Sequence, residues 1–67
     1  MEVTCNLTAL LDERNLTLAE LSRQTGISVV NLSVLKNGRA RAIRFSTLVS
    51  ICHALECNVG DLLSLTT

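Results

Sequence analysis

The sequence predicts an all-α domain in which five short helices pack compactly around a central helix-turn-helix. Two helix start signals stand eleven residues apart in the stretch Thr17–Asn37, with Gly26 between them. The composition agrees with this class, because 48% of the residues are hydrophobic, proline is absent and Phe45 is the single aromatic residue. A chain of 67 residues has room for one domain, residues 1–67, with a small aliphatic core.

The first helix of the central unit is expected over residues 18–25. Thr17 and Glu20 have the spacing of a capping box, in which the threonine accepts from a backbone N–H and the glutamate reaches back to the cap. Gly26 then supplies the positive φ that a tight turn needs. These signals predict a short helix that stops at Gly26.

The second helix of the unit is expected over residues 29–37, with Ser28 as its N-cap and Gly38 after its end. Leu32 and Leu35 continue an apolar stripe and should face the core. The outward side of this helix is then formed by Val29, Val30, Ser33, Val34 and Asn37.

Three further helices are expected to complete the core. The first covers about residues 4–14, where apolar side chains recur at helical spacing, and both Thr4 and Asn6 are candidates for its N-cap. The fourth begins after Ser46 as its N-cap. Its buried face consists of Leu48, Ile51, Cys52 and Leu55. The fifth opens at Asn58 with Asp61 at its third helical position. Its apolar face consists of Leu62, Leu63 and Leu65.

Charge is distributed unevenly along the chain, although the formal net charge is zero. All six acidic residues lie outside the window 21–55, and five of the six basic residues lie inside it. Such asymmetry creates a local positive field and favours an anionic partner there. The alternative is a solvated basic loop that binds nothing. The basic residues of this window are Arg23, Lys36, Arg39, Arg41 and Arg44.

Membrane insertion and secretion find no support in the sequence. Every apolar run is shorter than the roughly 20 residues of a membrane span. The first residues are acidic and lack the cationic stretch of a signal peptide. We therefore expect a cytoplasmic protein without a membrane partner, whose three cysteines are reduced thiols.

Metal binding and catalysis are also not expected. Cys52, His53 and Cys57 lie close in sequence, but a structural zinc ion requires four ligands, and the usual Cys-x-x-Cys pair is absent. Cys52 should be a small buried hydrophobe, with His53 pointing to solvent. The chain has one histidine, no glycine-rich phosphate loop and no carboxylate pair placed for acid–base chemistry. The sequence thus predicts no enzyme, no cofactor and no small-molecule ligand.

The chain resembles the Cro/cI (lambda-repressor-like, XRE-type) helix-turn-helix family over about Leu7 to Leu63. The motifs that carry the resemblance are LTLAELSRQTGISVVNLSVLKNG, then R-x-R-x-x-R-F-S-T-L, and later ALECNVGDLL. The resemblance implies a five-helix DNA-binding domain, typically of a repressor and often dimeric. It contributes the expected partners, double-stranded DNA and a second copy of the chain.

The resemblance also implies which residues meet DNA. The base-facing positions are Ser28, Val29, Val30, Ser33 and Val34. Thr17, Asn37, Arg39 and Arg44 match positions that commonly meet the sugar-phosphate backbone, and Lys36 and Arg41 belong to the same basic segment. The chain departs from the family pattern by placing valine where glutamine, arginine, asparagine or serine is usual. Valine cannot make bidentate hydrogen bonds to bases, but it can contact the methyl group of thymine.

These observations favour a sequence-selective transcriptional regulator. The resemblance further implies that it is a repressor and that it acts as a homodimer. The helix over residues 28–37 would enter the major groove while the segment 36–44 contacts the backbone. The alternative is a helix-turn-helix reused for protein–protein interaction through its exposed valines, unless some of these valines are buried against a neighbouring helix. The candidate dimer interface is the fifth helix, with Val59, Leu62 and Leu65, and the alternative is their burial in the monomer.

Overall fold

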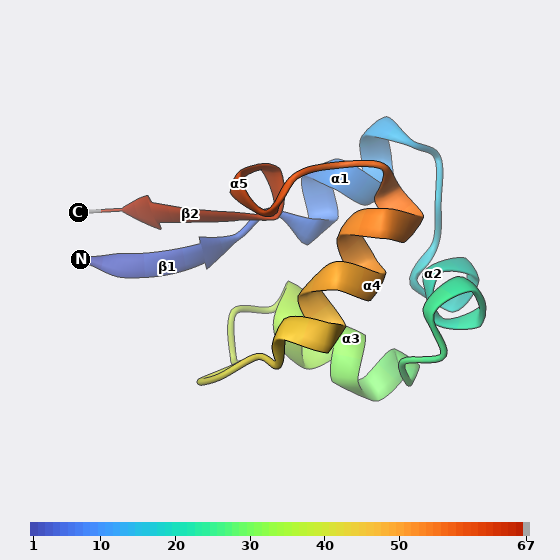
Figure 1. Ribbon diagram of the computed structural model, residues 1–67, viewed down its shortest axis with the longest axis horizontal. Helices are drawn as coiled ribbons and strands as arrows, with labels where there is room; N and C mark the ends of the chain where they lie inside the picture. Colours follow the sequence, from blue (N-terminus) through green and yellow to red (C-terminus); the bar gives the residue numbers. More distant parts are fainter. Residues whose placement is uncertain (67) are drawn as a thin grey trace.

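The computed structural model describes residues 1–66, in which five helices and two strands follow one another along the chain (Figure 1). The five predicted helices are confirmed, whereas the all-α class is wrong because of the two strands. In order, the elements are β1 (Glu2–Cys5), α1 (Leu7–Glu13), α2 (Leu18–Thr25), α3 (Val29–Lys36), α4 (Phe45–Leu55), α5 (Val59–Leu62) and β2 (Leu63–Thr66).

The two strands join the ends of the described chain in an antiparallel sheet. Their register runs from Glu2 opposite Thr66 to Cys5 opposite Leu63. Of the two candidate N-caps of the first helix, Thr4 is wrong because it lies in β1, and Asn6 is the residue at that position. The extension of the fifth helix to Leu63 and Leu65 is also wrong. Both segments alternate polar and apolar residues, and their pairing links positions about sixty residues apart, which no local window of sequence can detect.

Asn6 connects this sheet to the helices. Its backbone N–H donates to the carbonyl of Leu62 at 2.7 Å, and its side-chain Nδ2 donates to the carbonyl of Asp61 at 3.3 Å. The amide side chain therefore binds the end of α5 instead of capping α1. This is why α1 begins only at Leu7, where the chain leaves the sheet.

The core draws side chains from all five helices. Leu32 and Leu35 of α3 are buried as predicted, and so is the predicted face of α4. The fully buried large side chains are Leu7, Leu21, Leu32, Ile51, Leu55 and Leu62. At the edge of this core the guanidinium of Arg14 donates to the carbonyl of Leu55, which satisfies the last turn of α4.

The predicted start of α4 is wrong by two residues. Arg44 is the N-cap with an extended backbone, and its carbonyl accepts from the Leu48 N–H at 3.1 Å. Ser46 consequently lies within the first turn. No helix among residues 1–66 combines the length and the apolar character needed to cross a membrane.

Candidate nucleic-acid interface

The capping box predicted at the start of α2 is confirmed. The Thr17 hydroxyl accepts from the Glu20 N–H at 3.1 Å, and the Glu20 carboxylate accepts from the Thr17 N–H at 3.1 Å. At the other end, Gly26 has φ +76°, the left-handed conformation expected there. Helix α2 therefore begins and ends where the sequence predicts.

Two hydroxyl groups of α2 fix the turn into α3. The Ser22 hydroxyl donates to the carbonyl of Ile27 at 2.6 Å. The Thr25 hydroxyl donates to the carbonyl of Leu21 at 2.8 Å and accepts from the Ile27 N–H at 3.2 Å. The hydrogen bond of Ser22 was not predicted from the sequence. These bonds satisfy the polar groups of the turn and hold α3 at a set angle to α2.

Helix α3 presents the exposed valine face that the sequence predicts. The Ser28 hydroxyl accepts from the Asn31 N–H at 3.1 Å, so this residue serves as the N-cap of the helix. Val29, Val30 and Val34 are 45%, 71% and 38% exposed, which excludes their burial against a neighbouring helix. Ser33 is half-buried and its hydroxyl accepts from the Asn37 side-chain amide at 3.3 Å. We call Val29, Val30 and Val34 the valine face.

One flank of the valine face is a basic hollow of about 560 Å³. It lies between α3, which contributes Asn31 and Val34, and the segment that leads to α4. The cations that line it are Arg39, Arg41 and Arg44. In the described part of the chain the one ion pair joins Arg14 to Glu13 at 3.3 Å. None of the three arginines of the hollow is therefore paired with a carboxylate in residues 1–66.

The opposite flank holds two further residues that were predicted to contact the DNA backbone. Thr17 and Lys36 line a smaller hollow of about 280 Å³ together with residues of α1 and α2. Lys36 and Asn31 are five positions apart on α3, and at 100° per residue they lie on different sides of the helix. The valine face is thus bordered on both sides by groups that can bind phosphate, although Asp12 also lines the Lys36 side.

Asn31 is a potential contact residue that the sequence reasoning missed. Its side chain is exposed at the rim of the basic hollow, beside Val34. The available signal was its spacing, because residues three apart on a helix are neighbours on its surface. An amide there provides the hydrogen-bonding capacity that valine lacks.

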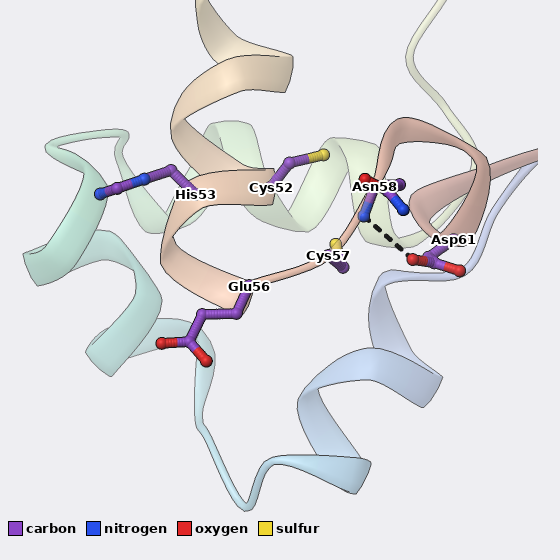
Figure 2. A pocket seen from close by; sticks show the side chains of 6 residues that line it. All are labelled: Cys52, His53, Glu56, Cys57, Asn58 and Asp61. Carbon is purple, nitrogen blue, oxygen red and sulfur yellow. Dashed lines mark hydrogen bonds between the residues drawn. The ribbon is translucent and has the colours of Figure 1, made fainter.

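The cysteine-rich region forms a separate hollow of about 390 Å³ on the α4–α5 side (Figure 2). Figure 2 shows His53 pointing away from Cys52 and Cys57, and His53 is exposed as predicted. Across residues 1–66, no group of three or more histidine, cysteine or acidic side chains is placed to hold a metal ion. Burial, followed by the neighbouring Cys52, raises the pKa of the Cys57 thiol. Nothing in this geometry connects the hollow with the valine face.

The apolar face that was predicted on the fifth helix as a dimer interface is not formed by Val59, Leu62 and Leu65 in the monomer. Leu62 is fully buried in the monomer, and Leu65 belongs to β2. Val59 remains exposed on α5. A helical apolar face made of these three residues therefore does not exist, because α5 ends one turn after it begins.

Comparisons with known proteins agree with the helix-turn-helix geometry. A family model described as the Cro/C1-type HTH DNA-binding domain matches residues 6–67. The chain is also 51% identical over 63 residues to the uncharacterised HTH-type transcriptional regulator YozG of Bacillus subtilis (strain 168). That alignment covers 94% of this chain and 75% of the relative.

Proposed function

Because the chain belongs to the Cro/C1-type helix-turn-helix DNA-binding family, we propose that it regulates transcription by inserting α3 into the major groove of specific duplex sites. The family is one of DNA-binding regulators and not of enzymes. The observation that carries the proposal is the exposed valine face of α3 with cations on both of its flanks. A major groove accommodates one α-helix and places phosphates along both of its sides.

Phosphate contacts are assigned to the two flanks. Arg39, Arg41 and Arg44 would meet one strand, and Lys36 with the Thr17 hydroxyl would meet the other. Asn37 lies exposed at the end of α3 and would add a neutral backbone contact. Such contacts fix the orientation of the helix in the groove and carry no sequence information themselves.

Base selection is assigned to the valine face and its immediate neighbours. Val29, Val30 and Val34 would contact thymine methyl groups, which are the apolar features of the major groove. Asn31 could add a bidentate hydrogen bond to adenine from the rim of the basic hollow. Ser28 and Ser33 have hydroxyl groups at the same surface, although both already accept hydrogen bonds within the protein.

We further propose that two copies act together as a repressor in the cytoplasm, where duplex DNA is available. One copy offers few phosphate contacts, so a second copy on a neighbouring half-site would be needed for tight binding. Half-sites read by paired helix-turn-helix units lie about 34–36 Å apart, one turn of the duplex. Repression is the outcome that the family resemblance implies.

Selection of bound duplexes from a random pool, followed by replacement of thymine with uracil, tests this function. Uracil lacks the methyl group, and each buried CH2-sized group contributes about 0.8 kcal/mol. We expect selected sites that contain thymine, and affinity several-fold lower when the contacted thymines become uracil. Val30→Ala should lower affinity for the thymine duplex and reduce the effect of uracil.

The matched control is Val49→Ala, which shortens a similarly exposed valine on α4 that lines neither of the hollows beside the valine face. Its affinity for DNA should equal that of the unmodified chain. Equal affinity for thymine and uracil duplexes, at every selected position, would argue against base selection by methyl contact.

A second candidate function is protein binding through the same valine face. The exposure of three valines on one short helix favours it, because apolar patches on small proteins mark partner sites. The two functions separate when Val30→Ala is measured. Loss of a protein partner with unchanged DNA affinity would select this candidate over DNA recognition.

A further inference from the structure

The chain makes a closed turn at the end of α4, and this turn joins Cys52 to Cys57. The Cys57 N–H donates to the carbonyl of Cys52 at 3.0 Å, and the Glu56 N–H donates to the carbonyl of His53 at 3.2 Å. Glu56 has φ +52°, in the left-handed region. Together these features form a Schellman motif, in which the residue after the left-handed one packs against a residue of the last helical turn. Both of those residues are cysteines here, and we call them the thiol pair.

The backbone of this turn has the dimensions that a disulfide requires. The path from the Cα atom of Cys52 to that of Cys57 through their hydrogen bond is about 7 Å long, and it bends at the carbonyl and at the amide. The two Cα atoms are therefore closer than that, within the roughly 4.4–6.8 Å that disulfides span. Both residues are free thiols in this structure. A bond between them needs rotation of side chains and little movement of the backbone.

The side chains of the thiol pair lie on the same side of the helix end. Figure 2 shows both sulfur atoms on one side of α4 and the His53 ring on the other. Burial, followed by the neighbouring Cys52, raises the pKa of the Cys57 thiol, which is the behaviour of two thiols close enough to interact. Both cysteines also line the same hollow. The turn and the side chains therefore agree on one arrangement.

The two thiols differ in how easily a reagent can reach them. Cys52 is 9% exposed, whereas Cys57 is half-buried. The hollow beside them has a volume of about 390 Å³. Small-molecule sites typically measure about 300–1,000 Å³, so a small organic molecule can enter it. A reagent in the hollow meets Cys57 first, with Cys52 placed to react in a second step.

We propose that the thiol pair is a reversible modification site, which small-molecule disulfides oxidise to an intramolecular Cys52–Cys57 disulfide. The Cys57 thiolate attacks one sulfur of the small disulfide, forms a mixed disulfide and releases one thiolate of the reagent. The Cys52 thiolate then attacks the Cys57 sulfur and releases the second thiolate. Two electrons pass from the thiol pair to the reagent, and the two protein thiol protons leave on the two released thiols.

The third cysteine stays outside this reaction. Cys5 lies in β1 and lines a different hollow, together with residues of the segment 38–43. It should remain a thiol while the pair is oxidised. The valine face contributes no residue to the hollow of the thiol pair, so the modification goes beyond DNA binding and does not depend on it.

Oxidation of the folded chain by the disulfide of mercaptoethanol, at mildly alkaline pH, tests the proposal. This reagent is uncharged, so the carboxylates of Glu56 and Asp61 at the hollow neither attract nor repel it. The number of titratable thiols should fall from three to one per chain, and the intact mass should fall by two hydrogen atoms. Cleavage after Glu56 should leave the two peptides joined until dithiothreitol is added. Oxidation should become faster as the pH rises, because the thiolate is the attacking form.

Two variants provide matched controls, and circular dichroism should show that both remain folded. Cys5→Ser keeps the pair, so it should lose both of its thiols in the same way. Cys57→Ser removes the first sulfur attacked, so it should form no intramolecular disulfide. The peptide map of the unmodified chain needs no variant and is decisive by itself. A persistent mixed disulfide on Cys57, a disulfide that includes Cys5, or three thiols remaining after prolonged incubation would each overturn the proposal.

Discussion

Val30 and Leu32 are two positions apart on α3 and have opposite environments. Leu32 is fully buried while Val30 is 71% exposed. The difference follows from the helical period, since two residues correspond to a rotation of about 200°. One turn of helix thus supplies both a core residue and a surface residue that can contact a base. The position of each of these two residues on the helix therefore decides whether it packs in the core or lies on the surface.

The thiols offer a residue-level prediction that is independent of DNA. Burial raises the pKa of Cys5, and burial together with Cys52 raises the pKa of Cys57. The protonated thiol is therefore favoured in the folded state, and unfolded thiols ionise first as pH rises. We expect the free energy of unfolding to fall as pH increases through the ordinary thiol range, near a pKa of about 8.5, and beyond it.

Chemical denaturation at a series of pH values measures this effect, with Cys57→Ala as the control that removes one of the two contributions. Alkylation by iodoacetamide gives a second readout, because the thiolate is the reactive form. Cys57 should react more slowly than free cysteine at neutral pH. A reaction as fast as that of free cysteine would contradict the raised pKa.

At the scale of elements, the turn between α2 and α3 fixes how the valine face is presented. Gly26 adopts φ +76°, and the hydroxyl groups of Ser22 and Thr25 satisfy the adjoining backbone. The direction of α3 relative to α2 therefore depends on a left-handed glycine and two short side chains. Substitutions in this turn should affect both stability and DNA affinity.

Gly26→Ala and Gly60→Ala should change stability in opposite directions. An alanine Cβ at either site would lie more than 4 Å from any neighbouring heavy atom of residues 1–66, so neither substitution creates a clash. A left-handed conformation costs a residue with a Cβ about 1–2 kcal/mol, and Gly26→Ala should destabilise by that amount. Gly60 lies in α5 without a positive φ, so alanine there should stabilise by about 0.4–1 kcal/mol. Urea denaturation of both variants decides the matter, and changes of the same sign would refute the conformational explanation.

The elements that sequence reasoning predicted well are those with local signals. Thr17 and Glu20 mark the start of α2, and Gly26 marks its end. The sheet was missed because Val3 and Leu65, which pair in it, are far apart in the sequence and adjacent only in the folded chain. Arg44 carries no capping side-chain signal, so the start of α4 was placed at the nearest serine instead.

The candidate site shows the same division. Exposure of the valine face follows from the period of α3 and was predicted correctly. The gathering of Arg39, Arg41 and Arg44 at one hollow depends on the path of the segment between α3 and α4, which partly buried Ile43 attaches to the core. No periodic pattern describes such a segment. Asn31 was missed because the predicted outward side of α3 did not include it, although its side chain is exposed.

At the scale of the whole molecule, a net charge of zero conceals a separation of charge. Acidic residues occur outside the window 21–55, and four of the five basic residues within it line the two hollows beside α3. Binding to DNA should therefore respond to the local field and not to the net charge. Salt dependence is the property that reports this field, since each neutralised phosphate releases condensed counterions.

Titration of a selected duplex over a range of salt concentrations tests the central claim most directly. Each phosphate contact should add about 0.9 to the slope of log affinity against log salt, and Arg39→Gln or Arg44→Gln should each lower that slope by about one. Arg23→Gln, which removes an exposed cation outside both hollows, should leave the slope unchanged. Absence of duplex binding at low salt, or binding with no salt dependence, would contradict DNA recognition by the valine face and its basic flanks.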